Sequence, residues 1–230
     1  MMLSCNAINF QYPGTTTQVF TDLNFQLRAT GFHALFGPSG VGKTTLAKMI
    51  CNQMQGYSGK ITTNGKTRIL FTYNLERLPG WSSVKDHLEW NTPANRQGLL
   101  NDLIETFGLQ QCLESRFAQL SLGQQNRTNL ARYLLQDFDL LIMDESLANV
   151  DEVTKETIIL KMKALFPDRS FLYISHSVAE VAKFCAEIVV LRSHRKSPQA
   201  VVLRGQDHKN DRTLNTESYE QTMLEMVNAF

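Results

Sequence analysis

Two short segments of the sequence carry residues that could act on a phosphorylated ligand. The first is GPSGVGKTT, in which Gly37, Gly42, Lys43 and Thr44 fit the pattern G-x-x-x-x-G-K-[ST]. Glycines at these positions let backbone N–H groups converge on a β-phosphate, the lysine neutralises phosphate oxygens, and the threonine hydroxyl can bind Mg²⁺. A glycine-rich turn that arose by chance is the alternative, and a flanking strand and helix make it the weaker one. The segment predicts a phosphate-binding loop.

The second segment, LLIMDE, ends an apolar run with Asp144 and Glu145. Asp144 is placed to hold Mg²⁺ through water, and Glu145 can act as general base toward the water that attacks a γ-phosphate. A solvated acidic turn is the alternative. It is disfavoured because strand ends beside a phosphate loop are where α/β sheets bind ligands. Kinases and GTPases share both segments, so these alone do not identify the protein.

The elements that must position these residues follow from hydrophobic periodicity. A strand at 32–36 enters the glycine loop directly, and Leu46, Met49, Ile50 and Met54 follow it at helical spacing. Strands alternating with helices predict a mostly parallel sheet. The other predicted elements are antiparallel strands within 6–27, two strands around a turn at Asn64-Gly65 and a helical region of about 84–135. They continue with a strand in FDLLIMDE, a helix of about 152–166, a strand SFLYISH, a closing pair of strands (AEIVVLRS, AVVLRG) and a helix at 219–227.

Composition favours one α/β domain covering residues 1–230, with the helical region of about 84–135 inserted in its core. The chain has 230 residues, of which 43% are hydrophobic, enough to bury a full core. Its formal net charge of +1 lacks the basic excess expected of a nucleic-acid-binding protein. The four cysteines are far apart, which favours reduced thiols over disulfides or a zinc site. No apolar run is long enough to span a bilayer, so we expect a chain that is neither exported nor membrane-spanning.

A third segment, LSLGQQNR, reads as the opening of a helix that could bind an anion. Ser121 offers a hydroxyl and Gly123 allows close backbone approach, beside the positive end of the helix dipole. The phosphate loop already surrounds a β-phosphate in this chain. A second anion-binding helix start would therefore best serve a nucleotide held by another molecule.

With its continuation, LSLGQQNRTNLARYLL resembles the signature motif, commonly LSGGQ, of ATP-binding-cassette (ABC) ATPases. GPSGVGKTT, LLIMDESLANVD and YISHSVAEV resemble that family's Walker A motif, Walker B motif with D-loop, and histidine switch, in the same order. The resemblance covers roughly residues 6–191. It implies a P-loop NTPase (RecA-like) core with a mostly parallel sheet, an antiparallel β subdomain and an inserted α-helical subdomain.

The resemblance also implies ATP and Mg²⁺ as cofactors and a role for each matching residue. Tyr12 would stack on adenine, with an aromatic turn residue beside Pro13 as the alternative. His176 would contact the γ-phosphate and orient Glu145, although a lone histidine is more often structural. Catalytic roles fall to Glu145, His176 and Lys43, metal contacts to Thr44, Asp144 and Asn74, and nucleotide contacts to Tyr12, Gly37, Pro38, Ser39, Gly40, Val41, Gly42, Lys43, Thr44, Thr45, Asn74, Ser121, Gly123, Gln124 and Asp151.

Three positions depart from the family pattern. Leu122 replaces the first glycine of LSGGQ, and Ser146 replaces a proline after the acidic pair. In ILFTYNLERLPGW, Asn74 aligns with the usual Q-loop glutamine, although the alignment can shift by a residue or two. Asparagine keeps the amide but is one methylene shorter. Its reach to Mg²⁺ or water is reduced, which puts the coupling of hydrolysis to a partner in question.

The resemblance implies the ATPase subunit of a membrane transporter. Ser121, Gly123 and Asp151 would complete the site of a second copy in a head-to-tail dimer, most simply a homodimer. The dimer would dock on permease subunits at the cytoplasmic face of the cell membrane, with a solute-binding protein serving the permease. ERLPGWSSVKDHLEW loosely resembles nitrate, sulfonate and taurine importer ATPases, which favours import of a small solute, unless Trp81 and Trp90 merely pack the helical arm. The alternatives are an exporter or lipid-trafficking ATPase, a soluble ATPase of DNA maintenance or translation, and a plain phosphate-loop kinase or a degenerate binding module.

Overall fold

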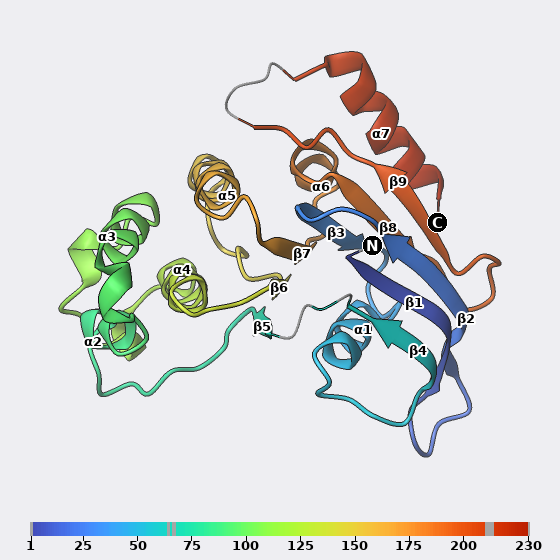
Figure 1. Cartoon of the computed structure of the whole chain (residues 1–230), viewed down its shortest axis with the longest axis horizontal. Helices are drawn as coiled ribbons and strands as arrows, with labels where there is room; N and C mark the ends of the chain where they lie inside the picture. Colours follow the sequence, from blue (N-terminus) through green and yellow to red (C-terminus); the bar gives the residue numbers. More distant parts are fainter. Residues whose placement is uncertain (1, 64, 66–67, 210–213, 230) are drawn as a thin grey trace.

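Two β-sheets form the framework of the chain. The computed structural model describes residues 2–63, 65, 68–209 and 214–229. A three-stranded antiparallel sheet has the order β2-β1-β4, and a six-stranded sheet has the order β5-β6-β7-β3-β8-β9 (Figure 1). In the larger sheet neighbouring strands are parallel except β8 and β9. The strands are β1 (Leu3–Gln11), β2 (Gln18–Leu27), β3 (Phe32–Phe36), β4 (Ser58–Thr62), β5 (Ile69–Tyr73), β6 (Leu140–Asp144), β7 (Ser170–Ile174), β8 (Glu187–Leu191) and β9 (Ala200–Arg204).

Helices cover both faces of the larger sheet, and a further group of helices lies beyond one of its edges. Helices α2, α3 and α4 gather beyond the β5 end of the sheet, while α7 lies along β9 (Figure 1). The predicted fold class, with a mostly parallel core, an antiparallel sheet and a helical region, is confirmed. The helices are α1 (Lys43–Ile50), α2 (Val84–Glu89), α3 (Gln97–Thr106), α4 (Leu122–Leu134), α5 (Glu152–Leu165), α6 (Val178–Phe184) and α7 (Thr216–Asn228), with short 3₁₀ turns η1 (Ala94–Arg96), η2 (Gln110–Cys112) and η3 (Phe117–Gln119).

Two hydrophobic cores lie on opposite faces of the six-stranded sheet because strand side chains alternate in direction. In β7, Phe171 and Tyr173 join the core that continues through α5 and α6 into α2, α3 and α4. Leu172 and Ile174 join the core built with α1 and the three-stranded sheet. β3, which ends at the phosphate loop, and β6, which ends at the acidic pair, are likewise buried along their whole length.

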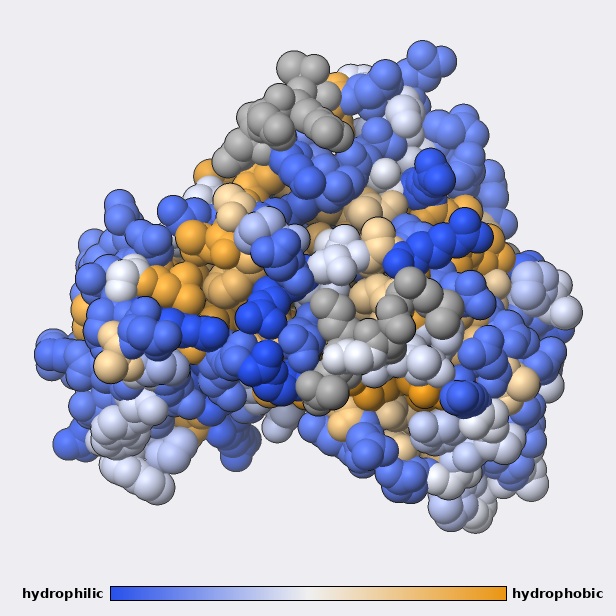
Figure 2. Space-filling model, in the orientation of Figure 1, coloured by the Kyte–Doolittle hydropathy of each residue, from blue (hydrophilic) through white to orange (hydrophobic). Residues whose placement is uncertain are grey.

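No helix among the described residues is long and apolar enough to cross a bilayer. The face of the molecule shown in Figure 2 is mostly hydrophilic, and its hydrophobic patches are interrupted by polar residues.

The two strands predicted around Asn64-Gly65 both exist but do not pair with each other. β4 pairs antiparallel with β1, and β5 pairs parallel with β6. Asn64 itself lies outside the described residues. The difference follows from burial: Phe71 and Thr72 of β5 are buried within the larger sheet, whereas β4 is an edge strand with no fully buried residue.

Three helix predictions differ in detail. Met54 lies beyond α1, which ends at Ile50 because Asn52 turns the chain with a φ of 61°. α7 starts ahead of the predicted residue 219 because the Asn215 side chain accepts a hydrogen bond from the backbone of Ser218 and caps the helix. α6 was not predicted, since its seven residues are too few for a clear period.

Candidate ATP-binding site

The phosphate loop runs from the end of β3 to the start of α1 along a path that requires glycine at both ends. Gly42 has a φ of 107°, and a Cβ there would lie 2.8 Å from side-chain atoms of Phe20 and Val19. Gly37 has a φ of 149°, and a Cβ there would lie 2.6 Å from the carbonyl oxygen of Leu191. The antiparallel sheet and β8 therefore press against this loop and leave no room for larger residues.

The first turn of α1 has no side-chain cap among the described residues. Uncapped N–H groups at a helix start can bind an anion, and the helix dipole adds to the attraction. α3 also lacks a side-chain cap, whereas α2, α4, α5, α6 and α7 are capped by Ser83, Ser121, Asp151, Ser177 and Asn215 respectively.

Lys43 is the first residue of α1 and is folded back over the loop. Its Nζ donates to the carbonyl oxygens of Gly37 at 2.7 Å and Pro38 at 3.0 Å. Burial lowers the pKa of Lys43, and the nearby carboxylates of Asp144 and Glu145 raise it. The loop thus holds an ammonium group in place where a phosphate would be bound.

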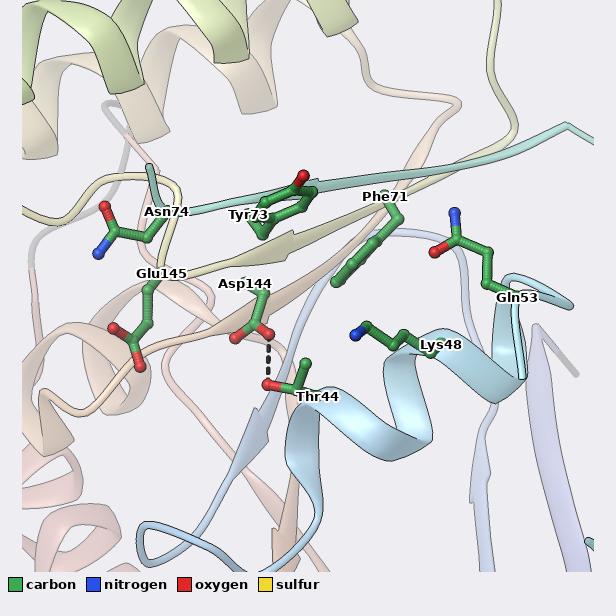
Figure 3. A pocket seen from close by; sticks show the side chains of 8 residues that line it. All are labelled: Thr44, Lys48, Gln53, Phe71, Tyr73, Asn74, Asp144 and Glu145. Atoms are coloured by element: carbon green, nitrogen blue, oxygen red, sulfur yellow. Dashed lines mark hydrogen bonds between the residues drawn. The ribbon is translucent and has the colours of Figure 1, made fainter. Parts of the chain in front are cut away.

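Asp144, the last residue of β6, lies against the start of α1. The Thr44 hydroxyl donates to Asp144 Oδ2 at 2.5 Å (Figure 3). Burial raises the pKa of Asp144 and Glu145 raises it further, while the Thr44 hydrogen bond and Lys43 lower it. The paired oxygens of Thr44 and Asp144 suit Mg²⁺, which takes oxygen ligands and usually completes its shell with water and substrate phosphates. Within the described residues no group of three or more His, Cys, Asp or Glu side chains could hold a metal ion.

Glu145 and His176 form a second polar pair beside the first. Glu145 has a φ of 53°, a left-handed conformation that costs energy for a residue with a side chain. Its backbone N–H donates to the carbonyl of Ile174 at 3.0 Å. Its Oε1 lies 2.7 Å from His176 Nε2, and both side chains reach solvent, with exposed fractions of 37% and 54%. The Glu145 carboxylate and the His176 imidazole thus face the open side of the site.

Two adjoining cavities meet at Thr44, Asp144 and Glu145. The larger, of about 460 Å³, also contacts Asn74 (Figure 3). The smaller, of about 340 Å³, is bordered by Tyr12, whose hydroxyl lies 2.6 Å from Thr45 Oγ1. The structure thus brings together at the smaller cavity the predicted residues Tyr12, Ser39, Gly40, Gly42, Lys43, Thr44, Thr45, Asp144, Glu145 and His176.

Three further residues lie at the phosphate loop, two of them within it and one on β2. Pro38 and Val41 line a neighbouring hollow with Ser39 and Gly40. Val19 of β2, which the sequence analysis did not single out, lines the smaller cavity beside Tyr12. Val19 lies in an ordinary alternating strand pattern, so nothing in the sequence indicated that it lines a cavity.

The predicted residues Ser121, Gly123, Gln124 and Asp151 line neither cavity. Ser121 and Gln124 form a capping box at the start of α4. Ser121 Oγ accepts from the Gln124 backbone at 3.3 Å, and Gln124 Oε1 accepts from the Ser121 backbone at 2.9 Å. Asp151 caps α5 by accepting from the Thr154 backbone at 2.9 Å, and this bond lowers the pKa of Asp151. These residues form a separate cluster at two helix starts.

Gly123 is needed for packing, whatever it binds. A Cβ on Gly123 would lie 2.3 Å from the carbonyl oxygen of Asn149. We expect Gly123→Ala to displace the loop after β6 and to lower the free energy of unfolding by about 1–3 kcal/mol, as overpacking does. Gly98→Ala in α3, where nothing lies within 4 Å, is the matched control and should raise stability by about 0.5–1 kcal/mol. Urea unfolding of both variants measures the difference, and equal stabilities would contradict the packing argument.

Asn74 connects the acidic pair to α4. Its backbone N–H donates to the Asp144 carbonyl at 2.9 Å, and its Oδ1 accepts from Asn126 Nδ2 at 2.8 Å. The amide oxygen is therefore directed at α4 in this structure, and a metal contact by Asn74 stays a prediction. Asn126 was not predicted as a site residue. Its only signal in the sequence is a polar residue on the buried side of an amphipathic helix.

Comparison with known proteins identifies the family. The model of the family described as ABC transporter matches residues 20–148, more than half of the chain. The chain belongs to the ABC transporter family. The family predicted from the signature, Walker and histidine-switch segments is confirmed, and with it the assignment of the chain to the ABC ATPases.

Several relatives are ATP-binding proteins of import systems. Molybdenum import ATP-binding protein ModC of Mesorhizobium japonicum is 36% identical over 179 residues, covering 69% of this chain and 48% of ModC. The chain thus spans about half the length of that relative. Taurine import ATP-binding protein TauB of Roseobacter denitrificans is 29% identical over 80% of this chain and 75% of TauB. An uncharacterised ABC transporter ATP-binding protein of Haemophilus influenzae is 30% identical over 88% of both proteins.

A solved structure described as the ATP binding subunit of an ABC transporter has the same fold. It matches with a TM-score of 0.79 and 21% identity, over 99% of this chain and 100% of the other. At this identity the match shows the fold alone.

Proposed function

We propose that this ABC ATPase hydrolyses ATP with Mg²⁺ and that the hydrolysis drives solute import through a separate membrane permease. One arrangement carries the proposal: the Thr44–Asp144 and Glu145–His176 pairs lie side by side at the uncapped start of α1. The start of α1 and the Lys43 ammonium group provide positive charge for phosphates, and Thr44 and Asp144 provide oxygens suited to a divalent cation. Glu145 provides a base near solvent.

Each residue of the smaller cavity then has a defined role. Tyr12 packs against the adenine, and the loop N–H groups and Lys43 bind the β- and γ-phosphates. Thr44 and Asp144 would hold Mg²⁺, which would supply neutralisation of the charge on the phosphate oxygens. Glu145 accepts a proton from the attacking water as the water oxygen bonds to the γ-phosphorus and the bond to ADP breaks. His176 holds the Glu145 carboxylate toward that water.

The separate cluster supports a head-to-tail homodimer. Ser121, Gly123, Gln124 and Asp151 are far enough from this chain's own cavities to line neither of them. Ser121 and Gly123 open the thirteen-residue helix α4, whose positive end suits a phosphate. In the proposed dimer this helix start faces the ATP bound by the second copy, and Asp151 contacts that copy, so two shared ATP sites form.

The helical region of about 84–135, proposed as a subdomain inserted in a single domain of residues 1–230, supplies the surface for a permease. Trp81 and Trp90 flank α2 and are 78% and 71% exposed. They are therefore available to a partner rather than packed within the arm. The import names of ModC and TauB favour a small-solute importer. The ATPase would then lie at the cytoplasmic face of the cell membrane, bound to permease subunits that a solute-binding protein serves.

An affinity purification tests the transporter assignment. The Glu145→Gln variant, purified from detergent-solubilised membranes with ATP and Mg²⁺, should carry a polytopic permease that mass spectrometry identifies. Trp81→Ala/Trp90→Ala in the same background should lose that permease and keep ATP binding. Recovery of soluble factors, ribosomes or nucleic acid alone would instead favour the soluble ATPases of DNA maintenance or translation.

The role of Tyr12 has its own test. Tyr12→Ala should weaken ATP binding by about tenfold or more, because stacking of a base on an aromatic ring contributes about 1–3 kcal/mol. Tyr12→Phe keeps the ring and removes only the hydrogen bond to Thr45, so its affinity should stay within about threefold of the parent. Titration with a fluorescent ATP analogue measures both. Equal losses in the two variants would assign the role to the hydroxyl and contradict stacking.

A further inference from the structure

Asn126, in the middle of α4, makes three hydrogen bonds to segments outside its own helix. It is 1% exposed. Its Nδ2 donates to Asn74 Oδ1 and to the carbonyl of Ala148, both at 2.8 Å, and its Oδ1 accepts from the backbone N–H of Leu75 at 3.2 Å. A backbone carbonyl needs a donor and a backbone N–H needs an acceptor, so these two partners fix which end of the amide faces which segment.

Two of these bonds extend to the acidic pair from opposite sides. On one side, the backbone N–H of Asn74 donates to the carbonyl of Asp144 at 2.9 Å. On the other side, the backbone N–H of Ala148 donates to the carbonyl of Glu145 at 2.9 Å. The result is a closed ring of contacts that passes through Asn126, Asn74, Asp144, Glu145 and Ala148. We call these five residues the Asn126 ring.

The Asn126 ring includes the backbone of Glu145, which has an unfavourable conformation. The backbone of Glu145 has a left-handed conformation, which persists in a residue with a side chain only where the surrounding structure holds it. The Glu145 side chain reaches solvent and is held by His176 alone among the side-chain contacts described. Its direction therefore depends on the backbone between Asp144 and Ala148, which the Asn126 amide fastens at both ends.

We propose that Asn126 is a positioning residue for ATP hydrolysis: through the Asn126 ring it keeps the Asp144–Glu145 backbone in the conformation that aims the Glu145 carboxylate at the attacking water. The proposal rests on the ATP hydrolysis proposed above. It assigns Asn126 no contact with the nucleotide, so its loss slows turnover and leaves ATP affinity intact.

Asn126→Leu removes the amide with little change in shape, and Asn129→Leu is the matched control. Asn129 lies one turn further along α4, is also 1% exposed, and donates to the carbonyl of Glu76 at 2.7 Å without contacting the ring. We expect kcat of the full chain to fall about tenfold or more in Asn126→Leu, with the Kd for an ATP analogue within about threefold of the parent. Asn129→Leu also removes a buried amide and should lower the unfolding temperature, but it should keep kcat within about twofold of the parent.

A double-mutant cycle tests whether the ring acts as one unit. If Asn74 and Asn126 act through their shared hydrogen bond, Asn74→Ala/Asn126→Leu should be about as slow as the slower single variant. Multiplied losses in the double variant would contradict the ring. Equal kcat in Asn126→Leu and Asn129→Leu would overturn the positioning role, while a parent chain without ATP hydrolysis would refute the proposed function instead. Asn126→Ala loses the same hydrogen bonds and replaces the leucine variant if thermal unfolding shows that the latter does not fold.

Discussion

Glu145→Gln should lower the rate of ATP hydrolysis by about 10²- to 10⁴-fold, the range that a general base contributes, while ATP affinity stays within a few fold. The glutamine amide has the size of the carboxylate and can hydrogen-bond to His176 in its place. It cannot accept a proton from water. Asp144, which lies at 2.5 Å from the Thr44 hydroxyl, is unchanged, so the groups that bind Mg²⁺ and phosphate are retained.

Steady-state phosphate release and ATP-analogue titration measure the two quantities separately. Glu152→Gln, an exposed position in the first turn of α5, is the control with the same chemical change and should retain full turnover. Turnover in Glu145→Gln above about a tenth of the parent rate would give the base role to another group. Because ATP is bound but not cleaved, this variant should also accumulate as a dimer, which light scattering after gel filtration detects. If the variant is inactive but stays monomeric, the general-base role of Glu145 would be supported and the proposed ATP-bound dimer would be contradicted.

The parts of the site that could be predicted from sequence are those whose geometry is local. The phosphate loop is one continuous segment whose path is set by a buried strand before it, a helix after it, and glycines with positive φ at Gly37 and Gly42. Asp144 is a hundred residues from Thr44, yet the edge where parallel strands end brings them together. The order of motifs along the chain was then enough to name the family.

Other features depended on contacts that no local pattern encodes. β4 and β5 have similar sequence patterns, but β4 pairs with β1 and β5 pairs with β6, which are distant along the chain, so the two strands lie in different sheets. Asn126 lies in the signature-like segment, in which the family pattern points to Ser121 and Gly123 as the binding residues. The hydrogen bonds of Asn126 to Asn74 and Ala148 form only when three segments of the chain pack together. Ser121 shows a different limit: a residue predicted for ligand binding also has a structural task as a helix cap.

Lys43→Ala should weaken ATP binding by about a hundredfold. A hydrogen bond to a charged group is worth about 1.5–3 kcal/mol, and each 1.4 kcal/mol changes affinity tenfold. Lys48→Ala is the matched control, since Lys48 lies on the same helix, carries the same charge and lines the adjoining cavity. Its Kd should remain within about threefold of the parent. Comparable losses in both variants would mean that general positive charge, rather than the position of Lys43, attracts the nucleotide.

A third variant, Lys43→Met, separates binding from folding. Lys43 is 7% exposed and its ammonium group is solvated only in part, by the carbonyls of Gly37 and Pro38. Burial is the largest influence on Lys43 and lowers its pKa, so the folded chain is destabilised by keeping this ammonium group charged, and a methionine of similar length avoids that cost. Lys43→Met should therefore unfold in the absence of nucleotide at the parent's temperature or above it, and should lose the thermal shift that ATP gives the parent. A lower unfolding temperature without nucleotide would show that the ammonium group holds the loop together as well as binding phosphate.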